Sequence, residues 1–214
     1  MVGHEVELRD TWRHLCGAAH TQALERLLGR YREPHRRYHT TEHVVWVVRH
    51  VSQIASTGID GDVPDDLPAV LLAALYHDAV YDPTATKAAN EIASAALAGA
   101  CAASFGWSDE RSSHVERLVF ATADHSVFDI DAAVLIDADL AVLGDEPGGY
   151  TAYVRGVRDE YAHVTNDTWR SARASVLESF LQRDAIFTTP FMYAQREARA
   201  RANLTAELTT LTLS

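Results

Sequence analysis

The segment LPAVLLAALYHDAV, residues 67–80, constrains the fold more than any other part of this 214-residue chain. Asp66 and Pro68 suit the start of a helix, and the residues that follow are apolar on nearly every side of such a helix. A helix of this kind must be buried all round, so other helices have to surround it. Elsewhere in the chain apolar residues recur at intervals of three and four and do not alternate, which predicts an all-α fold.

The rest of the chain predicts helices that pack around this central one. No repeat, low-complexity segment or long linker interrupts the sequence, so we expect a single domain over 1–214 with about eight or nine helices. Besides the central helix, the expected helices cover about 5–30, Thr40 or Thr41 to about 56, 87–105, 108–124 and 131–144, and three more begin near Gly149, Asp167 and Pro190.

Charge and cysteine content narrow the class of protein. Asp and Glu number 30 against 19 Lys and Arg, and the formal net charge is −11. Such a chain is repelled by nucleic-acid phosphates and by anionic lipids, so we expect neither nucleic acid nor a membrane as partner. Cys16 and Cys101 are isolated, and neither a signal peptide nor a long apolar span is evident, which is typical of a cytoplasmic protein.

Polar side chains intrude on apolar helices at three places. A His-Asp pair at 77–78 ends the central helix, where the helix dipole opposes a carboxylate and burial without a partner adds a penalty of several kcal/mol. Two aspartates interrupt the apolar run at 137–139, and two histidines stand before another at 39–43. One shared cation explains the three intrusions more economically than three separate salt bridges.

Helix geometry limits which of these groups can bind one ion. Residues two apart in a helix point about 200° from each other, so only one of Asp137 and Asp139 can be a ligand. His39 and His43 are four apart and share a helix face at a separation of about 6 Å, so one can bind a metal while the other reaches a substrate.

The order of these residues, His43, then His77 with Asp78, then Asp139, resembles the H…HD…D signature of the HD-domain superfamily of metal-dependent phosphohydrolases. Further matches to its predicted HD phosphohydrolase subgroup cover most of the chain: YHTTEH, YHDAVYDP, NEIASA, DADLAVLG and EARARANL. The resemblance implies an HD-type helical bundle with a metal-site core at about 36–144 and packing helices at 149–212. It also implies that these four residues are the metal ligands, with Asp137 as the alternative to Asp139.

Other residues gain expected roles from the same likeness. YHTTEH also resembles an element of the cyclic-nucleotide phosphodiesterases in which the first histidine protonates the leaving oxygen, so His39 is the expected catalytic acid. Glu91, in NEIASA, is expected to orient water or a ligand, unless it only favours the first turn of a helix. His125 is a candidate substrate contact or second proton carrier, with a plain surface histidine as the alternative. Arg37 and Lys87 are the cations expected to bind phosphate.

One divalent ion is the expected cofactor: Mn, Fe, Co, Ni, Zn or Mg. A second metal would need more histidines, and His114 and His125 are about 16 Å apart along a helix, too far to share a centre. Bound by two imidazoles and two carboxylates, an ion keeps open positions for water and a phosphoryl oxygen.

These features together predict a metal-dependent phosphohydrolase that acts on a phosphate ester or anhydride, plausibly a nucleotide. The expected partner is a small phosphorylated molecule, and a homodimer is compatible with the sequence. Two alternatives stay open: a non-catalytic domain that senses a metal or nucleotide, and an HD-fold metal oxygenase, which would favour the additional ligands of a di-iron centre.

Overall fold

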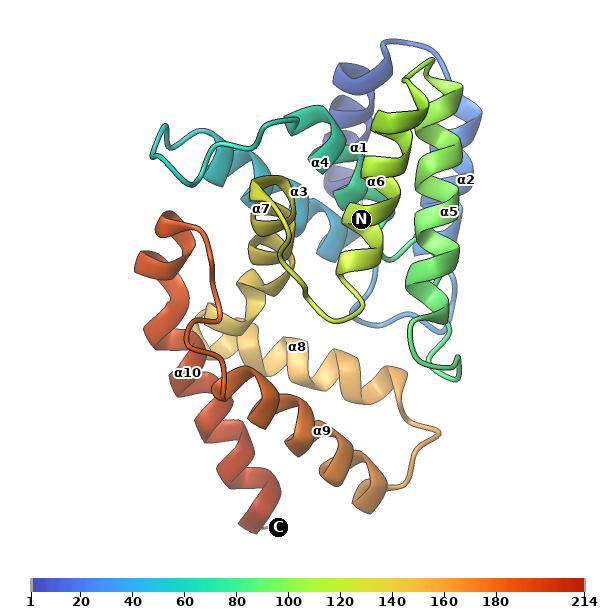
Figure 1. The fold of residues 1–214 in the computed structure, drawn as a ribbon. Helices are drawn as coiled ribbons and strands as arrows, with labels where there is room; N and C mark the ends of the chain where they lie inside the picture. Colours follow the sequence, from blue (N-terminus) through green and yellow to red (C-terminus); the bar gives the residue numbers. More distant parts are fainter. Residues whose placement is uncertain (1, 214) are drawn as a thin grey trace.

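The computed structural model describes residues 2–213, and this part of the chain is all α-helical, with no β-strand, as predicted (Figure 1). Ten α-helices and one 3₁₀ helix follow each other along the chain: α1 (Val2–Cys16), α2 (Thr21–Tyr31), α3 (Thr41–Ala55), α4 (Leu67–Tyr76), α5 (Ala89–Ser104), α6 (Asp109–Ala121), α7 (Ile130–Asp139), η1 (Leu140–Gly144), α8 (Pro147–Glu160), α9 (Asn166–Leu181) and α10 (Pro190–Leu213).

Residues 2–213 hold more helices than the eight or nine predicted. The single helix expected over 5–30 is two helices, because Gly17 and His20 both adopt left-handed backbone conformations, with φ of 68° and 59°. The helix expected over 131–144 changes character after Asp139, where the tighter 3₁₀ turn of η1 takes over. Such breaks arise from single backbone angles, which the apolar periodicity does not report.

The apolar segment does form the central helix. α4 packs against α1, α3, α5, α6 and α7, and all its residues from Ala69 to Tyr76 except Leu71 are buried. Asp66 fixes its start, because the carboxylate accepts a hydrogen bond of 3.0 Å from the backbone N–H of Ala69. No helix within residues 2–213 is long and apolar enough to cross a membrane.

The last three helices pack below and beside the first seven in the view of Figure 1, and α10 holds the segment that follows α7. Arg196 donates to the carbonyl oxygen of Ala141 at 3.0 Å, and the Asn203 amide donates to the carbonyl oxygen of Leu143 at 2.9 Å. Gly144 allows the close approach, since a Cβ there would lie 2.6 Å from Cβ of Arg196. Asn203, in the EARARANL element, and Arg196, directly before it, therefore anchor the chain that follows Asp139.

Candidate metal centre

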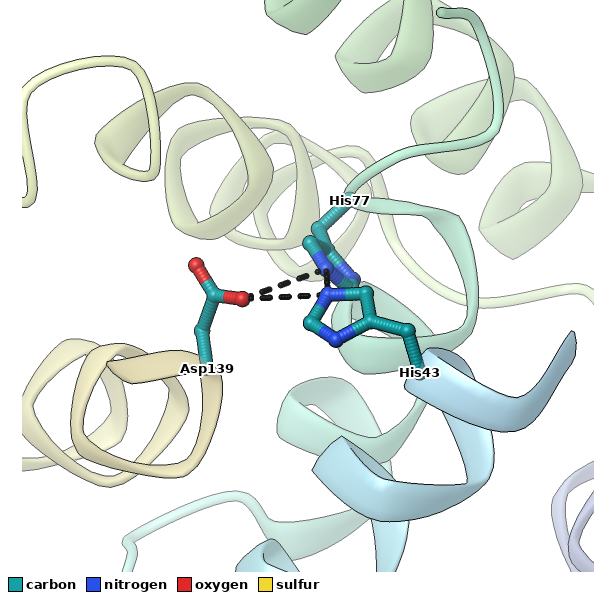
Figure 2. Close-up of side chains that lie close together, drawn as sticks. All are labelled: His43, His77 and Asp139. Atoms are coloured by element: carbon teal, nitrogen blue, oxygen red, sulfur yellow. Dashed lines mark hydrogen bonds and ion pairs between the residues drawn. The ribbon is translucent and has the colours of Figure 1, made fainter. Parts of the chain in front are cut away.

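Three helix ends bring the predicted metal ligands together, and Figure 2 shows three of them, His43, His77 and Asp139. His43 lies in the first turn of α3, which Thr40 caps by accepting a hydrogen bond from the Glu42 N–H. His77 and Asp78 follow the last residue of α4, and Asp139 is the last residue of α7. These residues are far apart in sequence, and only the packing of α3 and α7 against α4 makes them neighbours.

The ligand atoms lie close to one another. His43 Nε2 is 3.0 Å from His77 Nε2, and Asp139 Oδ1 is 3.3 Å from the first and 3.5 Å from the second. Asp78 Oδ2 lies 3.3 Å from His43 Nε2 and 3.0 Å from His77 Nε2. The atoms of His43, His77 and Asp139 form a group with all mutual distances within 4.8 Å, and Asp78 contacts its two imidazoles from outside this group.

These spacings fit a single divalent ion. With metal–ligand bonds of about 2.1 Å, neighbouring ligands lie about 3.0 Å apart in an octahedral site and about 3.4 Å apart in a tetrahedral one. The observed separations of 3.0–3.5 Å cover the same interval. Imidazole nitrogen with carboxylate oxygen is a donor set that suits Zn, Fe, Co, Ni and Mn.

Electrostatics in the cluster also favour a cation. Burial lowers the pKa of His77, but the charge of Asp78 and the contacts with Asp139 and Asp78 outweigh burial and raise it well above its usual value. Burial raises the pKa of Asp139, but contacts with His125, His43 and His77 outweigh it and leave that pKa well below its usual range. The carboxylates therefore stay ionised and hold positive charge beside them, which protons or a metal ion can supply.

Arg36 binds the backbone of residues in and beside the cluster. Its guanidinium is buried, with 4% of the residue exposed, and donates to the carbonyl oxygens of Asp78 at 2.8 Å, His39 at 3.1 Å and Ala79 at 3.2 Å. Two of these carbonyls belong to the turn that follows α4, where the helix dipole concentrates negative charge. Arg36 satisfies these carbonyls and leaves the carboxylate of Asp78 available to the imidazoles.

Asp137 points away from the cluster. It is fully buried and accepts hydrogen bonds from the backbone N–H groups of Thr188 and Thr189 and from the Thr189 hydroxyl, the last two at 2.7 Å. Burial raises its pKa to about 6 despite these contacts. The structure thus brings Asp139 to the histidines and uses Asp137 to hold the loop before α10, in the opposite-face arrangement expected for residues two apart.

His39 lies beside the cluster and is held by Glu160, a residue that the sequence did not single out. The Glu160 side chain, at the end of α8, is fully buried, and its Oε2 accepts from His39 Nδ1 at 2.7 Å and from the Tyr81 hydroxyl at 3.0 Å. Its Oε1 accepts from the backbone N–H groups of residues 37, 38 and 39 at 2.7–3.0 Å. Glu160 thus fixes both the loop that carries His39 and the orientation of its ring.

A cavity of about 310 Å³ contains the cluster and most of the other predicted residues. His125 lies at its edge, with Nε2 3.7 Å from the Asp139 Oδ2 atom that faces away from His43. Two other residues of NEIASA hold the loop after Asp78. Asn90 exchanges two hydrogen bonds with the backbone of Asp82, and the Ser94 hydroxyl accepts a hydrogen bond from the Val80 N–H. The predicted residues that line the cavity are His39, His43, His77, Asp78, Glu91, His125 and Asp139.

The structure does not bring the two predicted phosphate-binding cations into this cavity. Arg37 and Lys87 are both exposed, and neither lines it. Arg37 donates to the carbonyl oxygens of Pro34 and Arg36. His114 is also remote from the cluster, because it contacts Asp131 at 2.8 Å near the start of α7.

Comparison with known proteins adds no relative on which to base a role for this centre. No protein-family model, no curated protein and no solved structure matches the chain. What the centre can do has to be inferred from the side chains that surround it.

Proposed function

We propose that this chain is an HD-type helical bundle that binds one divalent metal ion and hydrolyses a phosphate ester or anhydride, plausibly of a nucleotide. The observation that carries the proposal is the convergence of two imidazoles and two carboxylates at ion-binding distances, within a cavity that His39 also lines. The HD signature and its flanking elements give independent support, because each lies at this cavity or holds a segment that reaches it.

The proposed ligands are His43, His77, Asp78 and Asp139. A bound divalent ion would supply Lewis-acid polarisation of a phosphoryl oxygen and lower the pKa of a water molecule. The protein keeps both carboxylates ionised and exposes one side of the cluster to the cavity, where a phosphoryl group can enter.

His39 would donate the proton that the leaving oxygen needs. Its Nδ1 donates to Glu160, so the ring is fixed and the Nε2 nitrogen remains for a substrate. The hydrogen bond to the buried carboxylate thus sets which ring nitrogen of His39 faces the cavity. His125 and Glu91 stand elsewhere on the cavity wall, where they can contact the phosphoryl group or a water molecule.

Two alanine variants test this division of labour after metal content has been measured by elemental analysis. His43→Ala should lose bound metal and, in metal-containing buffer, also lose thermal stability. His39→Ala should keep the metal and lose turnover by roughly 10²–10⁴, with the smallest loss on esters whose leaving group needs no proton.

His14→Ala is a matched control, because that histidine is exposed on α1 and far along the chain from the cluster. Turnover by the wild-type protein should be screened over nucleotides and generic phosphate esters with each candidate metal. A metal-loaded protein that binds nucleotides and hydrolyses none would instead support the sensor alternative. Loss of metal from His39→Ala would contradict the role given to that residue.

A further inference from the structure

The cavity that holds the metal cluster has an acidic inner surface. Asp78, Asp139 and Glu91 line it, and none of its lining residues within 2–213 is an arginine or a lysine. A divalent ion would balance the two aspartates. The groups left to contact the phosphoryl oxygens of a substrate are then the ion itself and the imidazoles of residues 39 and 125.

Arginines near this cavity donate to other groups. Arg37, which lines a neighbouring pocket that shares His43 with this cavity, donates to the carbonyl oxygens of Pro34 and Arg36. Arg36 donates to backbone carbonyls. Arg158 donates to the carbonyl oxygens of Tyr161 and Val164, and Arg173 forms a buried pair with Glu207 and donates to the Tyr153 hydroxyl. Releasing Arg173 for a ligand would leave Glu207 buried without its partner, which is strongly unfavourable.

Beside the cluster, the cavity has an apolar and aromatic wall. α8 and α9 contribute half of its residues, and the others come from η1 and from the position directly after α8. Val176 stands at the open edge, with 44% of its surface exposed. The residues of this wall are Leu140, Val142, Leu143, Tyr153, Val157, Tyr161, Val176 and Phe180.

From this division of the cavity we infer that the substrate carries a single phosphoryl group joined to an apolar or aromatic group, and is not a polyphosphate. The inference rests on the proposed phosphohydrolase function and specifies its substrate class. One phosphoryl group can sit between the metal cluster and His39, with its organic part against the α8–α9 wall. A second or third phosphate would place more negative charge beside Glu91 or against apolar side chains, with no guanidinium to receive it.

The size of the cavity agrees with a compact substrate. At about 310 Å³ it lies near the lower end of the range of about 300–1,000 Å³ for small-molecule sites. A nucleoside monophosphate or an aryl or benzyl phosphate belongs to the inferred class.

Two substrate comparisons test the inference on metal-loaded wild-type protein, with kcat/KM for phosphate or pyrophosphate release as the readout. The first compares AMP, ADP and ATP, which share one nucleoside. The second compares benzyl phosphate with glycerol 1-phosphate, in which both leaving groups are alcohols. We expect AMP to exceed ADP and ATP, and benzyl phosphate to exceed glycerol phosphate, each by about tenfold or more.

A variant that gains activity on ADP tests whether the lack of a guanidinium is what excludes polyphosphates. Val176→Arg places a guanidinium at the open edge of the cavity and should raise the ADP/AMP ratio of kcat/KM by about tenfold. Val176→Gln adds a long neutral side chain at the same position and should leave the ratio unchanged, as should Val6→Arg on the exposed face of α1.

The outcomes separate the two proposals. Hydrolysis of ADP or ATP as efficient as that of AMP, or of glycerol phosphate as efficient as that of benzyl phosphate, would overturn the substrate class and leave the phosphohydrolase intact. Hydrolysis of none of the five compounds by fully metal-loaded protein would overturn the proposed function, and the substrate class with it.

Discussion

A variant of Glu160 tests whether this buried carboxylate stabilises the loop that carries His39. Comparing the free energy of unfolding at two pH values isolates the contribution of the Glu160 charge. The carboxylate receives five hydrogen bonds inside the protein, three of them from the backbone of 37–39. Burial raises its pKa, but the hydrogen bond and charge of His39 and the backbone N–H groups of 37 and 39 outweigh burial and lower it from 4.5 to about 2. The folded protein therefore favours the ionised form.

The sign and size of the effect follow from that pKa. A depressed carboxylate pKa contributes stability that is fully present above the unfolded value of 4.5 and is lost as pH falls toward about 2. A shift of this size, at 1.36 kcal/mol per unit, corresponds to about 3 kcal/mol at pH 7. At pH 3.5 the unfolded chain has already bound its proton, and about 1.4 kcal/mol of this contribution has gone.

Glu160→Gln removes the charge and nearly preserves the shape. Denaturant unfolding at pH 7 should show the variant less stable than wild type by about 3 kcal/mol, and the gap should narrow to about half at pH 3.5. Glu178→Gln, at an exposed position of α9, is the matched control and should change stability little at either pH. A gap that is absent at pH 7, or of the same size at both pH values, would refute the reasoning.

Two further predictions concern the metal. Asp139→Asn should lose bound metal while Asp137→Asn keeps it, as elemental analysis would show; the reverse result would mean that the wrong aspartate has been assigned. Metal affinity should fall as pH is lowered, by about tenfold per pH unit for each proton that the metal displaces. The protons compete because contacts with Asp78 and Asp139 outweigh burial and raise the pKa of both His43 and His77 in the metal-free protein. Titration calorimetry at pH 8, 7 and 6 would measure this, and a constant affinity would contradict it.

The sequence predicted the helical class and also that polar side chains from three apolar helices would lie together. Both predictions were possible because both features depend on burial. An apolar run such as 67–76 has to lie inside, and charged groups within or beside buried helices need partners. Helix geometry also predicted that only one of Asp137 and Asp139 would face the cluster, since residues two apart occupy opposite helix faces, whereas the choice of Asp139 came from the resemblance to the HD signature. The structure places Asp139 in the cluster and Asp137 under the loop before α10.

The buried positions and the hydrogen bonds of Glu160 and Arg36 could not be predicted by the same reasoning. An acid at the last position of the amphipathic segment PGGYTAYVRGVRDE looks like a solvated residue, and the loop that it binds lies more than a hundred positions earlier in the chain. Arg36 and Arg37 are adjacent and chemically identical, yet the first is buried against backbone carbonyls and the second is exposed. Only the folded structure distinguishes these two arginines, because the charge and the apolar periodicity of the sequence are the same for both.

In the proposed function, the placement of the cluster at helix ends favours a metal ion over an arginine as its cation. α4 and α7 both direct their C-terminal ends toward it, and these ends add partial negative charge to that of Asp78 and Asp139. The guanidinium of Arg36 donates to the carbonyl oxygens after α4 and to no carboxylate of the cluster. A small ion can lie among the ligand atoms of His43, His77 and Asp139, which are 3.0–3.5 Å apart, with Asp78 3.0–3.3 Å from the two imidazoles. In the proposed function the bound ion would supply the charge that polarises the phosphoryl group, so metal binding precedes substrate binding.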